Sequence, residues 1–555
     1  MGIPEYGKRG GFPALARYLQ DQLDTWLTQY SSAEIRLAEL LCDRHAKDPH
    51  RVALRYEDAS GGKAQYTFAE MLDQSARFAA VLRDLGVAKG DRVAILLPKS
   101  PELMIAVLGL WRLGAVHVPL FTAFGPEAVG YRVSHSGARV VVTNSVNRFK
   151  VATSSAELPL NVLVVEDPSV TPVPADTPFC ASVQKARPVQ EAAAFAATDP
   201  FVIIYTSGTT GPPKGAMCTL RLLAAVDAYM HFGLDVRDND VYWNMADPGW
   251  AYGFAFALLG PLLIGHTTLF VNSPFDPALA LDVLQRYGVT NFASAPTAYR
   301  ALRAAGVSPE QKQRGPLRVA TSCGEPLNPE LIAWSTECLG IPIHDHYGQT
   351  EAGMPVVNHH LPLLIRPLRP GSMGHAAPGY RVVILDDNGL ELGPGQEGQV
   401  ALDILRSPLF YFSGYYKDPK RTAERFVVDG RYYLTGDAGS RDEDGYFFFS
   451  GRADDVIKSA GYRIGPFEVE SALISHDAVV EAAVVGKPDP LKGHIVKAFV
   501  MLKPGVTASE ALAGELSRHV KSRLGAHAYP REIEFVTGLP KTPSGKIQRF
   551  LLRQR

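Results

Sequence analysis

The sequence has few cysteines, no excess charge of either sign and no long hydrophobic run. Its five cysteines are scattered over 555 residues without a C-x-x-C pair, which argues against a zinc site and a disulfide framework. The formal net charge is -1, so no broad attraction to nucleic acid or to an anionic membrane is expected. The N-terminal segment lacks a signal-like apolar core, and together with free thiols this favours a cytoplasmic protein.

The most apolar stretch, residues 251–265, is shorter than the roughly 20 residues of a spanning helix, and Gly260 and Pro261 interrupt it. We interpret it as buried core. The hydrophobic content of 46% and the charged content of 20% are typical of globular proteins, and the length favours several subdomains.

Helix-like and strand-like runs alternate from residue 66 onward, as in residues 69–86, 92–97, 101–114 and 115–120. This alternation predicts largely parallel sheets covered by helices, with ligands at the carboxyl ends of the strands. Residues 153–200 are predicted to form a loosely structured connection with one apolar run, and a second α/β stretch follows.

Short strands and turn clusters replace this pattern after residue 370, which predicts a small antiparallel β subdomain at about 370–450. From residue 451 the pattern returns to mixed helices and strands over about 100 residues, enough for a separate small domain.

The string FVIIYTSGTTGPPKGAM, residues 201–217, places an apolar strand before a loop of glycines and hydroxyls that ends in Lys214, with a helix-like segment expected after it. Glycines let backbone N–H groups approach a phosphate, and the lysine adds positive charge, so the loop predicts nucleotide binding. It is not a Walker A loop, because Pro213 and Gly215 break that pattern. The alternative is an ordinary flexible surface loop.

This loop closely resembles the signature of the adenylate-forming (ANL) superfamily of acyl-CoA synthetases, luciferases and peptide-synthetase adenylation domains. Four further segments resemble other motifs of that superfamily in the same order: TSCGEPLNPE, HDHYGQTEAG, YLTGDAG and GRADDVIKSAGYRIGPFEVE. The resemblance implies a large N-terminal domain, residues 1–453, made of two doubly wound α/β subdomains and the β subdomain. A small, mobile α+β C-terminal domain, residues 454–555, would follow a hinge near Asp454.

The resemblance also implies roles for single residues. Tyr347 would stack on adenine, Asp437 would accept hydrogen bonds from both ribose hydroxyls, and Glu351 would bind Mg²⁺, a hard cation that bridges carboxylate and phosphate oxygens. Without the companion motifs, TSCGEPLNPE would be interpreted as a plain β-turn, Glu351 as a solvated surface charge and Asp437 as a turn aspartate. The implied ATP- or AMP-binding residues are Thr206, Ser207, Gly208, Thr209, Thr210, Gly211, Lys214, Gly324, Glu325, Pro326, Asp345, His346, Tyr347, Gly348, Gln349, Thr350, Asp437, Arg452 and Lys546.

Lys546, in KTPSGKIQR, is implied to be the catalytic lysine of adenylation, with Glu351, Thr206 and Lys214 as the other catalytic residues. An ammonium between the attacking carboxylate and the α-phosphate stabilises the transition state more than the ground state. The alternative is a solvated lysine in a basic tail. We also hypothesise that acylation of Lys546 would stop adenylation and spare thioester formation.

Coenzyme A is the expected acceptor, because the chain ends soon after Lys546 and residues 460–463 resemble the superfamily's thioester-forming face. The implied CoA-binding residues are Ala460, Gly461, Tyr462, Arg463, Lys492 and Lys521.

The stretch from residue 369 onward looks most like the medium-chain acyl-CoA synthetase branch. Acetate-specific relatives carry a tryptophan just before the Gln-Thr-Glu triplet, whereas this chain has Gly348, so an open pocket floor is expected. The acid is then predicted to be a short- or medium-chain fatty acid or an aromatic acid. Trp250 either lines the acyl and pantetheine channel or belongs to the core. His344, His346, His359 and His360 match no zinc spacing, and His346 is better explained as a pocket-lining residue.

The sequence therefore predicts an AMP-forming acyl-CoA synthetase that uses ATP, Mg²⁺ and CoA, acts as a monomer or homodimer, and has neither a nucleic-acid partner nor a membrane span. The alternatives are an adenylate-forming enzyme with a different acceptor and a non-catalytic nucleotide-binding homologue. The preferred acid and the pathway stay open.

Overall fold

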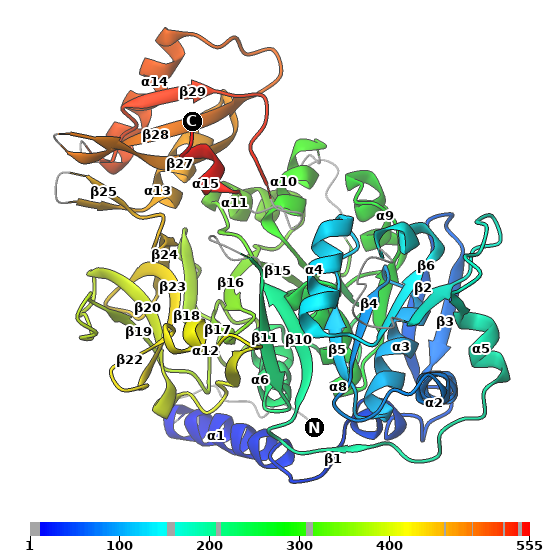
Figure 1. Ribbon diagram of the computed structural model, residues 1–555. Helices are drawn as coiled ribbons and strands as arrows, with labels where there is room; N and C mark the ends of the chain where they lie inside the picture. The colour runs from blue at the N-terminus through cyan, green and yellow to red at the C-terminus, as the bar shows by residue number, and fades with distance from the viewer. Residues whose placement is uncertain are drawn as a thin grey trace.

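The computed structural model describes residues 11–151, 161–206, 212–306, 315–459, 462–490, 492–525, 528–541 and 547–555. Two large mixed sheets with their helices form most of the molecule, and a smaller C-terminal sheet stands on one end of them (Figure 1). Within these ranges no helix is both long and apolar enough to cross a membrane.

The first sheet has a parallel centre with helices on both faces. Along β4, Val93 and Ile95 face the core under α2 and α3, whereas Ala94 and Leu96 face the core under α4. Such double burial explains the continuous apolar runs of these strands. In spatial order the strands are β21 (Phe412–Tyr415), β11 (Lys214–Thr219), β10 (Pro200–Thr206), β5 (Val116–Pro119), β4 (Arg92–Leu96), β6 (Val140–Asn144), β7 (Asn161–Val165) and β8 (Thr177–Pro178). The helices are α2 (Phe68–Asp84), α3 (Pro101–Arg112), α4 (Pro126–Ser136), η2 (Ser145–Lys150) and α5 (Phe179–Lys185).

The second sheet continues into the β subdomain without a break. Its parallel half packs against α9, α10 and α11 on one face. The strands run β19 (Val382–Leu385), β20 (Glu397–Asp403), β23 (Tyr432–Arg441), β24 (Phe447–Arg452), β18 (Ser372–Ala376), β17 (Gly353–Val357), β16 (His344–Gln349), β15 (Val319–Cys323), β14 (Asn291–Ser294), β12 (Tyr242–Asn244), β13 (Thr268–Val271), β2 (Val52–Glu57) and β3 (Lys63–Thr67), with β22 (Phe426–Val427) beside β23. The helices are α9 (Pro277–Arg286), α10 (Pro296–Ala304), α11 (Pro329–Cys338) and α12 (Pro419–Ala423), with a 3₁₀ turn, η6 (Ile404–Arg406).

Between the two sheets runs the apolar stretch that the sequence predicts to be core, and it is buried there. Helix α1 and the strand pair β1–β9 lie at the edge of this layer (Figure 1). These elements are α1 (Gly11–Gln29), β1 (Ile35–Arg36), η1 (Glu39–Asp43), β9 (Ala194–Phe195), α6 (Leu222–Ala228), η3 (Tyr229–Gly233), α7 (Ala251–Gly253), η4 (Phe254–Leu259) and α8 (Gly260–Ile264).

The C-terminal sheet has its own core, made mainly of β27, β28, α13 and α14. It contacts the rest of the chain where α13 meets β24 and α11: Asn328 Nδ2 donates to Ser471 Oγ over 3.1 Å, and the rings of Phe449 and Phe467 lie 6.2 Å apart. The elements are β25 (Ile457–Ser459), β26 (Tyr462–Ile464), α13 (Pro466–Ile474), β27 (Val479–Asp489), β28 (Gly493–Leu502), α14 (Glu510–Leu524), β29 (Glu532–Phe535) and α15 (Arg549–Leu552).

Two local predictions are wrong. Residues 161–165 are not part of a loose connection, because they form the buried strand β7, paired in parallel with β6. The segment after the glycine-rich loop does not begin as a helix, because residues 214–219 form β11, which pairs with β10 and with β21. The loop therefore joins a β-hairpin, and α6 starts only at Leu222.

Candidate active site

The glycine-rich loop lies at the end of the β10–β11 hairpin. Thr206, the last residue of β10, pairs with Lys214, the first residue of β11, and Thr206 Oγ1 donates to the Lys214 carbonyl over 3.5 Å. This register brings the hydroxyl of Thr206 and the ammonium of Lys214 to the same end of the hairpin. Ser207, Gly208, Thr209, Thr210 and Gly211 lie outside the described residues.

Tyr415 links Lys214 to Glu351. The Lys214 ammonium lies 4.6 Å from the centre of the Tyr415 ring, and the Tyr415 hydroxyl donates to Glu351 Oε1 over 2.8 Å. Burial lowers the pKa of Lys214, and the nearby guanidinium of Arg425 lowers it further, while Glu351 acts in the opposite direction. Glu351 is buried, with 7% exposure, so it is not the solvated surface charge of the alternative interpretation.

Asp437 is the centre of a hydrogen-bonded cluster. Tyr347 Oη and Gln349 Nε2 donate to Asp437 Oδ2 over 2.6 and 2.7 Å, and Arg452 Nη1 donates to Oδ1 over 2.8 Å. A carboxylate offers about four acceptor positions, so these donors leave about one. A ribose that uses both of its hydroxyls here must therefore displace one of these three donors from Asp437.

Arg425 belongs to this cluster, although the sequence motifs do not include it. A Cβ added to Gly436 would lie 2.5 Å from Arg425 Nη1 and 3.0 Å from Arg452 Nη2, so both guanidiniums converge on the glycine beside Asp437. Close approach explains why position 436, with a φ of +76°, is glycine. No sequence pattern marks Arg425 or Tyr415, because their partners lie on distant strands.

The predicted adenine segment lies beside Trp250. A Cβ on Gly324 would lie 2.6 Å from Trp250 Cη2, so the indole packs directly on this glycine. Glu325 is held by Thr297 Oγ1, at 2.8 Å, and by Arg300 Nη2, at 2.5 Å, while Pro326 follows it. Asp345 Oδ1 is buried and makes no hydrogen bond within the described part of the chain.

His346 lies in a buried aromatic group. Its Nε2 faces the Asn358 carbonyl at 2.7 Å and so carries the proton, which leaves Nδ1 to accept from the Tyr229 hydroxyl at 2.7 Å. Tyr229 contacts Tyr252, with 3.1 Å between the hydroxyl oxygens, and Phe256, with 4.4 Å between ring centres. His346 therefore serves packing and polar positioning.

The expectation of an open pocket floor at Gly348 stays a prediction, although Met354 packs beside this glycine. A Cβ at position 348 would lie 2.3 Å from Met354 Sδ and 2.4 Å from the carbonyl oxygen of Gly353. Because β17 pairs antiparallel with β16, Met354 fills the space beside the glycine. The neighbouring Thr350 accepts a hydrogen bond at its carbonyl from the Tyr411 hydroxyl over 2.7 Å.

The predicted CoA-binding residues are not brought together by contacts of the described residues. Lys521 lies over the ring of Tyr529 at 5.5 Å, and the backbone N–H of Lys492 donates to Asp489 Oδ1 over 2.9 Å, both within the C-terminal sheet. The backbones of Tyr462 and Arg463 pair with β25. Ala460, Gly461 and Lys546 lie outside the described residues.

The sequence matches two families in chain order. Residues 42–416 match the AMP-binding enzyme family, and residues 468–546 match the AMP-binding enzyme C-terminal domain. The chain belongs to the AMP-binding enzyme family. The predicted membership of the adenylate-forming superfamily and the predicted fold class are confirmed.

Relatives of this AMP-binding enzyme align over most of their length. The acetyl-coenzyme A synthetase of Bacillus subtilis (strain 168) is 39% identical over 517 residues, or 92% of this chain and 89% of the relative. The mitochondrial acyl-coenzyme A synthetase ACSM3 of Rattus norvegicus is 34% identical, with 98% and 91% covered. A crystal structure of a Brucella canis acyl-CoA synthetase is 49% identical, covers 94% of each chain and superposes with a TM-score of 0.74.

Proposed function

We propose that this AMP-forming acyl-CoA synthetase acts on an acid larger than acetate, either a short- or medium-chain fatty acid or an aromatic acid. The enzyme is an acid–thiol ligase. The acid and ATP give acyl-AMP and diphosphate, and acyl-AMP and CoA then give acyl-CoA and AMP.

The contact between Gly348 and Met354 is the observation that carries the choice of acid. The side chain that packs beside the glycine is a flexible thioether, which adapts to irregular space more readily than a rigid aromatic side chain. The rings of Tyr229, Tyr252 and Phe256 belong to the same buried apolar cluster as Met354. Each methylene buried in such a pocket contributes about 0.8 kcal/mol, so acetate gains least.

The geometry supports a nucleotide bound across the two sheets. Asp345 Oδ1, buried and unpartnered among the described residues, is suited to accept a hydrogen bond from the adenine amino group. Asp437 would take the ribose hydroxyls, and Arg452 would remain close to the ribose and phosphates. Lys214 and Thr206 would contact the triphosphate from the end of the hairpin.

Mg²⁺ would be held by Glu351. Its Oε1 accepts from Tyr415, while Oε2 makes no hydrogen bond within the described ranges, so one carboxylate oxygen remains for the cation. Mg²⁺ in ATP sites is commonly bound by one or two carboxylates together with phosphate oxygens and water. The ion would supply charge neutralisation of the phosphates.

Lys546 would supply the charge that adenylation needs. As the substrate carboxylate attacks the α-phosphorus, two anions approach each other. An ammonium between them stabilises this transition state more than it stabilises the ground state. Removing it is expected to slow adenylation about 10²- to 10³-fold. The C-terminal domain, from residue 454, would then turn about Asp454 to present Ala460, Gly461, Tyr462 and Arg463 to CoA.

Residence in a reducing compartment such as the cytoplasm is proposed from the sequence, whose five cysteines are scattered and form no C-x-x-C pair. A monomer or homodimer is proposed, and light scattering of the purified enzyme measures which.

The test is a panel of acids from acetate to decanoate, with benzoate, in two assays. ATP–diphosphate exchange reports acyl-AMP formation, and thioester formation reports transfer to CoA. We expect kcat/KM for the best acid to exceed that for acetate at least 10-fold, which corresponds to about two buried methylenes. Highest kcat/KM with acetate would contradict the proposed acid, and acyl-AMP without thioester would contradict CoA as acceptor.

A further inference from the structure

A buried cluster of two carboxylates and two guanidiniums joins the chain end to the hinge region. Arg549 donates to Glu470 in bidentate fashion, with Nη2 2.8 Å from both carboxylate oxygens, and its Nη1 lies 3.6 Å from Asp455 Oδ2. Arg553 Nη2 forms an ion pair with Asp455 Oδ1 and donates to the Asp454 carbonyl over 3.2 Å. The side chains of Glu470 and Asp455 are only 6% and 7% exposed.

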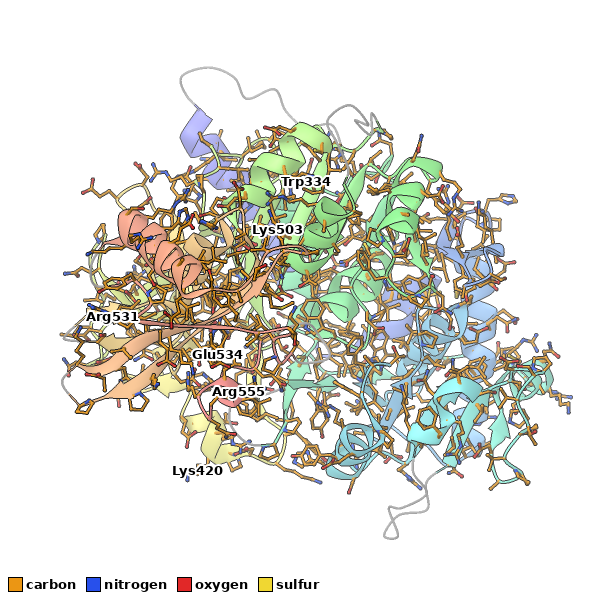
Figure 2. The ribbon with its side chains drawn as sticks, turned by 90° about the horizontal axis from the view of Figure 1, so that it is seen from above. Trp334, Lys420, Lys503, Arg531, Glu534 and Arg555 are labelled. Carbon is orange, nitrogen blue, oxygen red and sulfur yellow. The ribbon has the colours of Figure 1, made fainter. Side chains whose placement is uncertain are left out.

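These four residues come from three separate segments. Asp455 follows β24, Glu470 belongs to α13, and the two arginines lie at α15, beside the chain end. The backbone N–H of Val484 in β27 also donates to Glu470 Oε1 over 2.8 Å, so the central carboxylate has partners on both sides. Figures 1 and 2 both show the chain end, at Arg555, beside β29.

The same segment carries Lys546. Ile547 pairs with Lys541 in an antiparallel bridge and packs with Leu552, Phe499 and Val536 in a small apolar cluster. Lys546 directly precedes Ile547 in the chain and lies three residues before Arg549.

The cluster also connects to the nucleotide side. Arg452, which donates to Asp437, lies 3.7 Å from Asp454 through its Nε, and its carbonyl accepts from the backbone N–H of Asp455 over 2.9 Å. A chain of contacts thus runs from Asp437 through Arg452 and the hinge segment to Arg549.

We propose that Asp455, Glu470, Arg549 and Arg553 form a clamp that ties the segment bearing Lys546 to the hinge, and that Asp455 and Arg553 are positioning residues for adenylation. This inference rests on the proposed role of Lys546. The clamp fixes the lysine relative to the pivot of the domain, so that one orientation of the C-terminal domain delivers its ammonium accurately. Tyr462 and Arg463, which would face CoA, belong to β26, which pairs with β25, and neither is a member of the clamp.

The four clamp residues differ in how much their substitution is expected to destabilise the fold. Removing Arg549 leaves Glu470 buried and unpaired, which typically costs about 3–5 kcal/mol and endangers folding. Asp455→Asn keeps the Arg549–Glu470 pair and removes only the charge at the hinge. Arg553→Gln removes the outer arginine, which is 35% exposed.

The test measures both half-reactions in Asp455→Asn and Arg553→Gln, alone and combined with Lys546→Ala. Misplacing a catalytic group by about 1 Å costs up to about 10²-fold, so we expect adenylation kcat to fall 10- to 100-fold in Asp455→Asn and less in Arg553→Gln. The KM for ATP and thioester formation from supplied acyl-AMP should stay within twofold. In the Lys546→Ala background neither variant should lower adenylation further.

A matched control is Lys487→Gln, which breaks the exposed ion pair with Glu532, 2.6 Å long, on the same sheet, and should change neither half-reaction. Equal losses in both half-reactions, or the same additional loss in the Lys546→Ala background, would overturn the clamp alone. Normal adenylation by Lys546→Ala would overturn the role of the lysine and the clamp with it. Thermal unfolding midpoints of all variants separate these results from misfolding.

Discussion

Met354 is the residue whose size should set the length of the acyl chain. Its sulfur fills the space beside Gly348 and lies 4.0 Å from the sulfur of Cys323. Met354→Ala would remove three heavy atoms from the floor, so we expect the preferred acid to lengthen by one to three methylenes. The ratio of kcat/KM for the longer acid to that for the original acid should rise about fourfold per methylene. Kinetics with straight-chain acids from C2 to C10 measure the shift.

Met104→Ala is the control for this prediction. Met104 is also fully buried, but it lies in α3 of the first sheet, so its removal leaves a comparable cavity away from Gly348. Both variants should lose about 2–5 kcal/mol of stability. Only Met354→Ala should change chain-length preference, and an unchanged preference there would refute the role of Met354.

The sequence motifs identify some residues of the site but miss the residues that these contact from other segments. Asp437, Arg452 and Tyr347 do lie together, as their separate motifs suggest. Arg425 and Tyr415 complete the site from a segment that carries no motif. Their contribution depends on β21 crossing to the first sheet beside β11, and a pairing between residues about 200 positions apart leaves no local pattern.

Among the elements, the alternating helices and strands of both sheets and the two turn clusters of the β subdomain follow from the sequence. The turns at residues 386–389 and 442–445 join strands, as predicted. Strand β11 could not be predicted in the same way, because its six residues include lysine, glycine and alanine, which are depleted in strands. β11 forms a strand because it pairs with β10 and β21, so tertiary contacts rather than local sequence determine its conformation.

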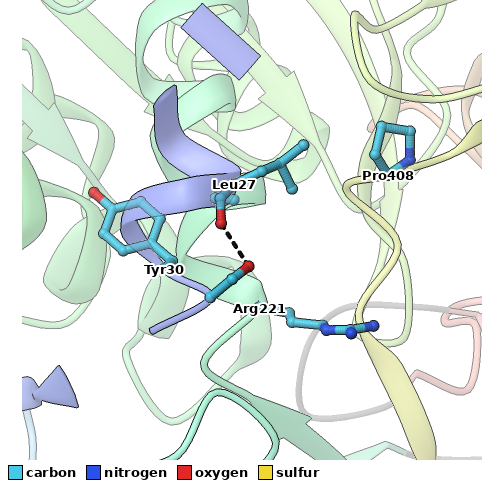
Figure 3. A pocket seen from close by; sticks show the side chains of 6 residues that line it. Leu27, Tyr30, Arg221 and Pro408 are labelled. Carbon is cyan, nitrogen blue, oxygen red and sulfur yellow. Dashed lines mark hydrogen bonds between the residues drawn. The ribbon is translucent and has the colours of Figure 1, made fainter. Parts of the chain in front are cut away.

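Tyr30, directly after α1, makes a buried hydrogen bond to α6. The Tyr30 hydroxyl donates to Asp227 Oδ2 over 2.6 Å. A cavity of about 200 Å³ lies beside Tyr30 (Figure 3) and is lined by Leu27, Tyr30, Ser31, Arg221, Ala224 and Pro408. Burial, and then the Asp227 charge, raise the pKa of Tyr30, so the phenol stays protonated and donates. Tyr30→Phe should lower the free energy of unfolding by about 1.5–3 kcal/mol, as expected for a bond to a charged acceptor.

Urea unfolding compares this variant with Tyr18→Phe within α1. Tyr18 packs against the same core, and no hydrogen bond of its hydroxyl is found among the described residues, so its loss should cost less than about 0.5 kcal/mol. Equal midpoints for both variants would contradict the importance of the Tyr30–Asp227 bond.

For the whole molecule, buried neutral histidines should make the free energy of unfolding depend on pH below about 6.5. This range begins above the pH at which carboxylates usually titrate. Burial lowers the pKa of His117 to about 3 and that of His359 to about 4, and it places the pKa values of His346 and His360 well below 6.5. Below pH 6.5 these histidines bind protons in the unfolded chain but stay neutral in the folded chain. Stability is therefore full above pH 6.5 and falls as the pH drops toward the folded pKa values.

His117 isolates this effect, because neither ring nitrogen makes a hydrogen bond in the described structure and the ring packs near Trp111 and Phe254. A group with a pKa of 6.5 unfolded and about 3 folded loses about 2 kcal/mol between pH 7 and pH 5. His117→Leu should remove this contribution to the pH dependence of the free energy of unfolding. Its urea midpoint should therefore fall less than that of the wild type between pH 7 and pH 5. The exposed His50→Gln removes a histidine without touching the core, and an identical pH response of both variants would show that burial of His117 is not the cause.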